Sequence, residues 1–275
     1  MTASQLERSG LCVRGARVDH GTILSVPRNG SNLRYVGFEA VRLHEGGHHA
    51  GNTSADEVAL VIISGIVTVH ANGITWARLG QRLDPFSGRP SAAYLPAGQS
   101  YEIVAHTEAE VGIFAAPALD SIPARLIDAS VVPSHVRGAG QSLRTINNIL
   151  MEDARASSLL VTEVQSPAGN WSSYPPHKHD ADNMPQESQL EETYYFRINP
   201  AQGFAFQRVY TADGELDETM TVHDGDLVMV PRGYHVVAAA AEYQVYYLNV
   251  LAGPRRALRL SFDPGHKWIM EGWTW

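Results

Sequence analysis

The chain has 275 residues, of which 44% are hydrophobic and 18% charged, and its formal net charge is −8. This length accommodates one large domain or two of roughly 130 residues. The acidic balance disfavours nucleic acid and anionic membranes as partners, because both require a basic surface. No segment approaches the roughly 20 apolar residues of a membrane span, and the first residues lack the apolar core of a signal peptide. Cys12 is the only cysteine, which excludes an internal disulfide. We therefore expect a cytoplasmic protein that binds neither nucleic acid nor membrane.

Short strands dominate the predicted secondary structure. Runs of β-branched and aromatic residues alternate with Gly, Pro, Asn and Asp, which is typical of all-β sandwiches and barrels. In chain order the expected strands are 35–43, 58–63, 66–70, 92–95, 101–104 and 111–115, then 159–165, 192–198, 204–210, 220–222, 226–230, 235–238 and 245–251. Pairs such as Asn72-Gly73 and Asp224-Gly225 tolerate the positive φ of tight turns. The predicted fold class is all-β.

The two halves of the chain share a pattern that indicates an internal duplication. Each half has a strand that follows an acidic residue, Glu57 or Glu192, and later a strand pair around a Pro-x-Gly turn at 96–98 or 231–233. We expect an N-terminal segment at 1–30 joining a first barrel at 31–120, a linker at 121–158, and a second barrel with a C-terminal tail at 159–275.

Histidines in the second half have the spacing of metal ligands. His177 and His179 are two residues apart, so both would face the same side of a strand. His235 follows the Pro-Arg-Gly turn, which positions it on the strand that leaves the turn. Together with a carboxylate, three imidazoles suit Zn²⁺, Fe²⁺, Mn²⁺, Co²⁺ or Ni²⁺. We predict a divalent metal, with Zn²⁺ as the first choice and Glu187, Glu191 and Glu192 as possible sources of the carboxylate.

The same residues carry a resemblance to a known family. The HxH pair, a following Glu and the P-x-G-x-H turn resemble the cupin superfamily. More specifically, the chain resembles the 5-deoxy-glucuronate isomerase family of inositol catabolism in the segments AGNWSSYPPHKHD, ESQLEETYYFRI, QGFAFQRVYT, VPRGYHVV and YYLNVLAGP. The resemblance implies two tandem cupin barrels (double-stranded β-helix or jelly-roll folds), of which only the second holds metal. It also favours Glu192 as the ligand, because the cupin glutamate opens an aromatic strand.

The resemblance implies the reaction as well: 5-deoxy-D-glucuronate is converted to 2-deoxy-5-keto-D-gluconate in myo-inositol catabolism. A metal with open coordination positions stabilises charge that develops on the substrate oxygens of such an aldose–ketose isomerisation. Either a base moves a proton through a cis-enediol, or a hydride shifts directly. Glu187, Glu191 and metal-bound hydroxide are the predicted bases, and Tyr194 or Tyr247 the predicted proton donor.

The carboxylate of a sugar acid requires a cationic partner, for which arginine offers a bidentate fit. Arg208 alternates with Phe206 and Tyr210, so it would clamp the carboxylate if this strand face lines the barrel interior. Arg197 and Lys178 are the alternatives, and Tyr194 is a further predicted substrate contact.

A second class of function shares the same ligand set. An Fe²⁺ cupin dioxygenase would use three histidines and a glutamate equally well, and a non-catalytic cupin could bind a sugar acid without turnover. Dependence on oxygen would identify the first, and an unchanged substrate the second. Exposed strand edges also predict a homo-oligomer.

Overall fold

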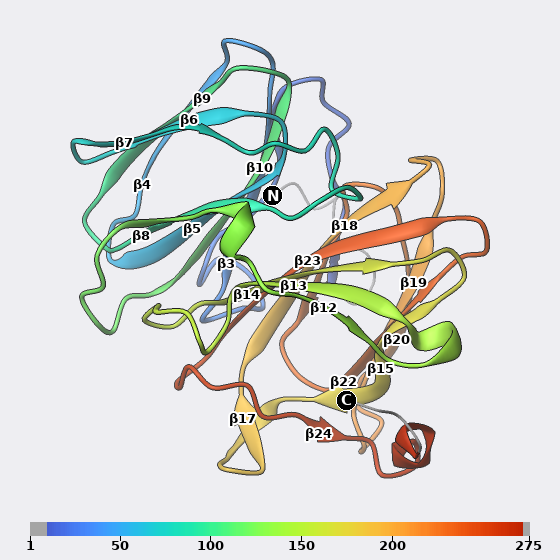
Figure 1. Cartoon of the computed structure of the whole chain (residues 1–275). Coiled ribbons are helices and arrows are strands. Elements are labelled where there is room, and N and C mark those ends of the chain that lie inside the picture. Colours follow the sequence, from blue (N-terminus) through green and yellow to red (C-terminus); the bar gives the residue numbers. More distant parts are fainter. Residues whose placement is uncertain (1–9, 272–275) are drawn as a thin grey trace. The chain divides into compact units, whose positions relative to one another are not determined.

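The computed structural model describes residues 10–271, in which nearly all regular secondary structure is β-strand (Figure 1). Residues 1–9 of the predicted N-terminal segment and residues 272–275 of the predicted tail lie outside the described residues. The chain divides into two compact units. We term residues 16–133 and 147–161 the first barrel, and the residues up to 15, 134–146 and from 162 onward the second barrel.

The first barrel consists of two sheets with the strand orders β11-β8-β5-β10-β3-β2 and β4-β9-β6-β7. The bounds are β2 (Gly21–Val26), β3 (Gly37–Leu43), β4 (His48–Asn52), β5 (Asp56–Ser64), β6 (Val67–Ala71), β7 (Ile74–Leu79), β8 (Ser91–Leu95), β9 (Ser100–Ala105), β10 (Ala109–Pro117), β11 (Arg125–Ile127) and the 3₁₀ turn η1 (Ala129–Val131). Alternate residues of each strand fill the core between the sheets, as Leu60 of β5 and Val69 of β6 do. Asn72 and Gly73 both have positive φ, as the predicted hairpin turn requires.

The second barrel repeats this construction, with the strand orders β1-β21-β18-β23-β14-β13-β12 and β20-β19-β22-β15-β24 and a hairpin of β16 and β17. The bounds are β1 (Cys12–Val13), β12 (Ser134–Arg137), η2 (Gly140–Ser142), β13 (Arg144–Leu150), β14 (Leu160–Ser166), β15 (Trp171–Lys178), β16 (Asp180–Asn183), β17 (Glu187–Gln189), β18 (Glu191–Asn199), β19 (Ala205–Tyr210), β20 (Asp217–Val222), β21 (Leu227–Val230), β22 (Tyr234–Ala239), β23 (Gln244–Ala252), β24 (Ser261–Phe262) and η3 (Lys267–Met270). Residues 10–271 contain no helix long and apolar enough to span a membrane.

The core of the second barrel lies between its two sheets. Tyr194, Phe196 and Ile198 of β18 alternate into it and meet Val209 of β19 and Val237 of β22. This alternation also places Glu192 on the interior face of β18, two residues before Tyr194.

The N-terminal residues are divided differently from the prediction. We expected residues 1–30 to join the first barrel, but β1 pairs with β21 of the second barrel, with Cys12 opposite Val228. The buried side chains of Leu11 and Cys12 explain this position, because they contribute to the core of the second barrel. β2 does lie in a sheet of the first barrel. The predicted linker likewise contains ordered strands, β11 to β13.

Candidate metal centre

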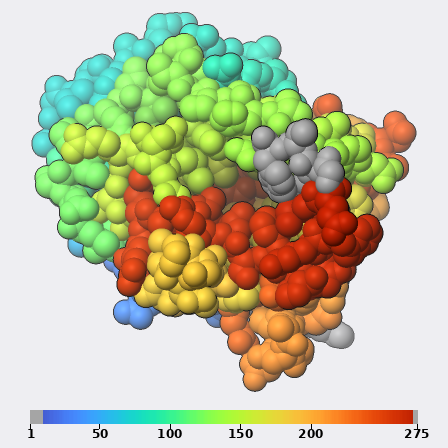
Figure 2. Space-filling view, turned by 60° about the horizontal axis from the view of Figure 1, so that its bottom comes forward, coloured from blue at the N-terminus to red at the C-terminus, as the bar shows by residue number. Residues whose placement is uncertain are grey.

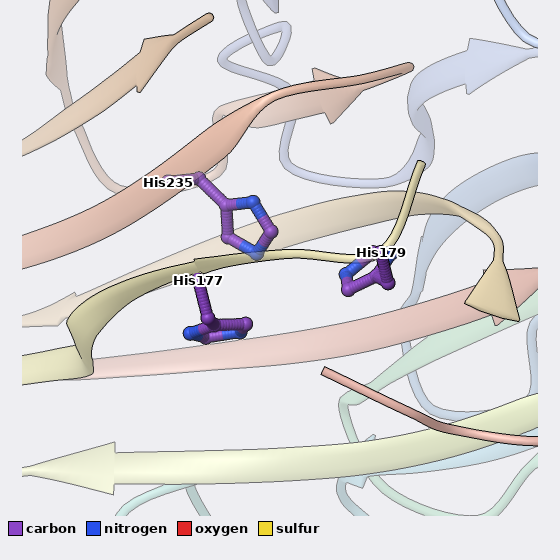
Figure 3. A group of neighbouring side chains, drawn as sticks. All are labelled: His177, His179 and His235. Carbon is purple, nitrogen blue, oxygen red and sulfur yellow. The ribbon is translucent and has the colours of Figure 1, made fainter. Parts of the chain in front are cut away.

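Three histidine side chains of the second barrel converge on one point (Figure 3). His177 lies near the end of β15, His179 directly follows that strand, and His235 lies in β22. Their nearest nitrogen atoms all lie within 4.8 Å of one another. Within residues 10–271, no other group of three or more His, Cys, Asp or Glu side chains lies close enough together to hold a metal ion.

An irregular stretch of β15 brings the histidines into place. β15 pairs with β22 at Ser172, opposite Val237, and again at His177, opposite His235. β15 therefore advances five residues where β22 advances two, and Ser173 in this stretch adopts a φ of 49°. Such a bulge reorients the strand, so His177 lies beside His235 across the sheet.

Backbone carbonyls select the tautomer of each imidazole. The Nδ1 atom of His179 lies 3.0 Å from the Leu190 oxygen, and that of His235 lies 3.0 Å from the Gly233 oxygen. His177 Nδ1 is 3.3 Å from the Pro175 oxygen. A carbonyl oxygen only accepts, so each Nδ1 must be the protonated donor. In its neutral form, a ring held in this way presents its Nε2 lone pair, which is the arrangement that metal-binding histidines use.

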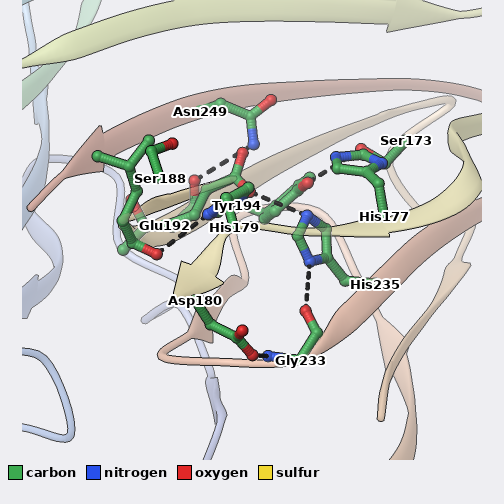
Figure 4. Close-up of polar contacts among 12 residues, drawn as sticks. Ser173, His177, His179, Asp180, Ser188, Glu192, Tyr194, Gly233, His235 and Asn249 are labelled. Carbon is green, nitrogen blue, oxygen red and sulfur yellow. Dashed lines mark hydrogen bonds and ion pairs between the residues drawn. The ribbon is translucent and has the colours of Figure 1, made fainter. Parts of the chain in front are cut away.

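Glu192 completes the cluster. Its Oε2 atom lies 3.1 Å from the Nε2 atoms of both His179 and His235 (Figure 4). Glu192 is 5% exposed and His235 is fully buried. The Nε2 of His235 faces the carboxylate without hydrogen-bond geometry, and it has no hydrogen-bond partner among the described residues. A buried nitrogen lone pair in this position is ready to bind a cation.

The electrostatics favour the metal-binding protonation states of Glu192 and His177. Burial raises the pKa of Glu192, but the interactions of its ionised form with His179 and His235 lower it overall, to about 2. Burial and the neighbouring His235 and His179 lower the pKa of His177 to about 3. Burial also lowers the pKa of His179, yet the hydrogen bond and charge of Glu192 raise it overall. An ionised carboxylate beside a neutral imidazole at pH 7 is a donor set that fits a divalent ion.

The three histidines differ in exposure. His177 is partly exposed, whereas His179 and His235 are buried. The segment that follows β23 lies next to His177, because β24 pairs with β15 and places Phe262 opposite His177. The backbone N–H of Arg259 donates to the Ser188 hydroxyl at 2.9 Å, and Figure 2 shows this red C-terminal segment beside the yellow β16–β17 region. Sequence reasoning did not predict this segment as part of the site, because nothing local indicates its distant partner.

Glu187, a predicted base, organises the β16–β17 hairpin. Its Oε1 accepts from the N–H groups of Asp180 and Ala181 at 2.9 and 3.0 Å and from Lys178 Nζ at 2.7 Å. Asp180 in turn accepts from the Gly233 N–H at 2.7 Å, which ties the hairpin to the turn before His235 (Figure 4). The hydrogen bonds of Glu187 thus support the loops that carry the ligands rather than reaching the histidines.

The two predicted tyrosines lie together beside the cluster. Ser173 Oγ is 2.9 Å from the Tyr194 hydroxyl and 3.3 Å from the Tyr247 hydroxyl. The Tyr194 ring stands edge-on to His235, with 5.7 Å between centroids. Burial raises the pKa of both Tyr194 and Tyr247. Both phenols are therefore protonated at neutral pH and available as donors.

The predicted arginines are not brought to the histidines. The condition for Arg208 as the carboxylate clamp is not met, because Ala205, Gln207 and Val209 occupy the interior face of β19. Arg208 instead forms a bidentate pair with Asp217, at 2.8 Å for both contacts, with its side chain 42% exposed.

Arg197 and Glu191 lie on the face of β18 opposite Glu192, as the strand's alternation dictates. Arg197 Nε donates to Asp224 at 2.7 Å. Neither residue therefore points to the cluster, although both are near it in sequence.

The first barrel uses its corresponding glutamate differently. Val58, Leu60 and Ile62 face the core of this barrel, so Glu57 faces the opposite side of β5. The carboxylate accepts from the N–H groups of Ser158 and Leu159, both at 2.6 Å. Glu57 and Glu192 therefore have similar positions in the sequence but point to opposite sides of their sheets. The Glu57 carboxylate binds the backbone of the segment that precedes β14.

Two two-sheet barrels, one of which contains three histidines and a glutamate, define a bicupin with a candidate metal centre. Oxalate decarboxylase of Bacillus subtilis has this fold: the TM-score is 0.63 at 13% identity, over 92% of this chain and 79% of that one. The KduI/IolB family model matches residues 11–269. A 5-deoxy-glucuronate isomerase of Geobacillus kaustophilus is 47% identical over 254 residues, 92% of each chain. The crystal structure of an iolB-like protein from Salmonella typhimurium gives a TM-score of 0.92 at 41% identity, over 94% of this chain and 98% of that one.

The chain belongs to the KduI/IolB family. The all-β cupin fold and the family resemblance predicted from the sequence motifs are confirmed.

Proposed function

We propose that this chain isomerises 5-deoxy-D-glucuronate to 2-deoxy-5-keto-D-gluconate at a divalent metal held by His177, His179, Glu192 and His235. The relatives named 5-deoxy-glucuronate isomerase support the substrate and the class of reaction. The observation that carries the site is the convergence of the histidine nitrogens on one another, with the Glu192 carboxylate between two of them. Zn²⁺ is our first choice because this mixed nitrogen and oxygen donor set suits it, and Mn²⁺, Fe²⁺, Co²⁺ and Ni²⁺ are the alternatives.

The residues around the cluster divide the remaining tasks. A bound divalent ion would stabilise negative charge that develops on the substrate oxygens. Tyr247 and Tyr194 hold protons on their hydroxyls, and Ser173 Oγ connects the two. We assign proton transfer to Tyr247 and a substrate hydrogen bond to Tyr194. Glu187 acts in this scheme as the anchor of the hairpin, because its carboxylate is already occupied by three donors.

A time course of ¹H NMR spectra tests the proposed reaction. The metal-loaded chain is incubated with 5-deoxy-glucuronate under argon and under air. We expect the aldehyde signals to be replaced by those of the 5-keto product at equal rates in both atmospheres, because isomerisation consumes no oxygen. Turnover that requires air would indicate the dioxygenase, and an unchanged spectrum would indicate a sugar-acid-binding module.

The proposal assigns a small sugar acid as the partner. The cytoplasmic location and the homo-oligomer stay predictions from the sequence.

A further inference from the structure

One arginine of the second barrel faces the interior. Ile146 of β13 packs against the core of this barrel, and Arg144 precedes it by two residues in the same strand. Alternate residues of a strand share a face, so Arg144 also points to the interior. Its side chain is partly buried, and burial lowers its pKa. A cation on an interior face requires a compensating partner.

Within residues 10–271, that partner is not a carboxylate. Arg144 Nη1 donates to the Ser142 carbonyl at 3.1 Å, and the guanidinium has no ion pair with any acidic residue described. Arg197 and Arg208, by contrast, are each paired with an aspartate through two contacts. The parallel N–H donors of the Arg144 guanidinium are therefore available to an incoming anion.

The surrounding segment holds this guanidinium in position. Gly138 has a φ of +92°, and a Cβ atom there would lie 2.7 Å from Arg144 Nη1 and 2.2 Å from the Ser142 oxygen. Glycine is thus required for the guanidinium to lie against this turn. η2 packs against β15, and the Leu143 carbonyl accepts from Asn170 Nδ2 at 2.8 Å. These contacts hold the Arg144 guanidinium in a defined position.

Arg144 lies on the same face of the same sheet as the metal centre's tyrosines. β18, β23, β14 and β13 are successive neighbours in this sheet. Tyr194 of β18 and Tyr247 of β23 belong to the core against which Ile146 of β13 packs, and Ser173 Oγ lies within hydrogen-bond distance of both tyrosine hydroxyls. Arg144 therefore faces the interior that also contains these tyrosines.

A second interior group is ready for a polar ligand. Gln207 of β19 is fully buried, and neither of its amide atoms has a hydrogen-bond partner among the described residues. Gln207 pairs with Val237, two residues from His235 on the same face of β22. An unmet buried amide is costly, and the hydroxyl groups of a sugar would satisfy it.

We propose that Arg144 binds the substrate carboxylate and makes the site specific for sugar acids over neutral sugars. The inference rests on the proposed function. Open-chain 5-deoxy-glucuronate carries its aldehyde at one end and its carboxylate at the other. With the aldehyde end at the histidine cluster, the carboxylate end meets the guanidinium past the two tyrosines. The fork of Arg144 matches a carboxylate with two parallel hydrogen bonds, which a neutral hydroxymethyl group cannot accept in the same way.

Kinetics of Arg144→Gln test the inference, with Arg208→Gln as the matched control. A charged hydrogen-bond pair of this kind corresponds to roughly a 10- to 100-fold change in kcat/KM, so we expect that loss for Arg144→Gln. Arg208→Gln removes an exposed ion pair and should stay within about twofold of the unmodified chain. Equal kinetics for the two variants would overturn the role of Arg144.

Equilibrium binding separates this inference from the proposed reaction. Calorimetry with D-glucuronate and D-glucose compares an acid with its neutral counterpart without requiring turnover. The unmodified chain and Arg208→Gln should prefer the acid, and Arg144→Gln should lose that preference while keeping its metal. If the unmodified chain shows this preference but no isomerase activity, the reaction is wrong and Arg144 stands. An unmodified chain without the preference, or an Arg144→Gln variant that keeps it, contradicts the inference. If Arg144→Gln does not fold, Arg144→Lys replaces it and should weaken the preference, because lysine lacks the fork.

Discussion

The backbone determines what each histidine of the cluster can do. Because carbonyl oxygens hold the Nδ1 atoms of His177, His179 and His235, the Nε2 atoms are the ones left to bind a cation. Glu192 adds a negative charge beside these rings, because its Oε2 atom lies 3.1 Å from the Nε2 atoms of His179 and His235. The cluster therefore depends on one carboxylate for its attraction to a divalent ion.

Substitution of Glu192 by Gln tests that dependence. The amide keeps the size of the side chain but removes its charge, so we expect the affinity for Zn²⁺ to fall at least about tenfold, as for the loss of a supporting group in other metal sites. Competition with a chromophoric chelator measures this affinity. Glu191→Gln, one residue away on the opposite face of β18, is the control and should bind Zn²⁺ normally. The reverse pattern would reassign the ligand.

At the level of single residues, the structure brings the three predicted histidines together but does not bring the predicted arginines to them. His177 and His179 follow from a two-residue spacing, and His235 from its turn. Arg208 shares one strand face with Phe206 and Tyr210, and it was the first choice for the carboxylate clamp on the condition that this face lines the barrel interior. The structure leaves Phe206 43% exposed and buries Gln207 completely. Arg144 was missed because its significance depends on tyrosines far away in the chain.

Among the elements, the β16–β17 hairpin links the parts of the metal centre. Asp180 and the buried Glu187 of the hairpin both pair with Lys178 at the end of β15, and Asp180 accepts from the Gly233 N–H. The hairpin begins directly after His179 and, through Asp180, also binds the turn that precedes His235. Its charges maintain the geometry of the site without touching the histidines.

Substitution of Glu187 by Ala distinguishes a structural role of this carboxylate in the hairpin from a role as the catalytic base. Loss of the carboxylate leaves the N–H groups of Asp180 and Ala181 unsatisfied, so we expect unfolding to become easier by roughly 2–3 kcal/mol. Chemical denaturation measures this free energy, and Glu215→Ala, which breaks the exposed pair with Arg232, should change it by less than about 1 kcal/mol. Unchanged stability together with lost turnover would instead make Glu187 the base.

Strands whose apolar and polar residues alternate clearly could be predicted from the sequence. Strands that are defined only by pairing with a strand distant in the sequence could not. The expected strands at 58–63 and 192–198 correspond to β5 and β18. β15 was recognised only at its HxH motif, because two consecutive prolines and the bulge obscure its pattern. β1 and β24 are two residues each, and only their partners β21 and β15 define them.

Across the whole molecule, the two barrels place their corresponding glutamates, Glu57 and Glu192, in different roles. Glu57 and Glu192 occupy corresponding places in the sequence, but one faces away from its barrel core and the other faces the interior. The duplication was visible in the turns and strands, whereas the orientation of Glu57 required the observed register. Within residues 10–271, the second barrel alone contains the histidine cluster.

A metal titration tests most directly whether this single centre performs the isomerisation. The chain is stripped with a chelator, Zn²⁺ is added stepwise, and bound metal and 5-deoxy-glucuronate turnover are measured at each step. We predict no turnover without metal, a linear rise with bound metal, and a plateau at about one equivalent per chain, since one cluster is present. Full turnover by the metal-free chain, or a rise that continues to two equivalents, would contradict the account.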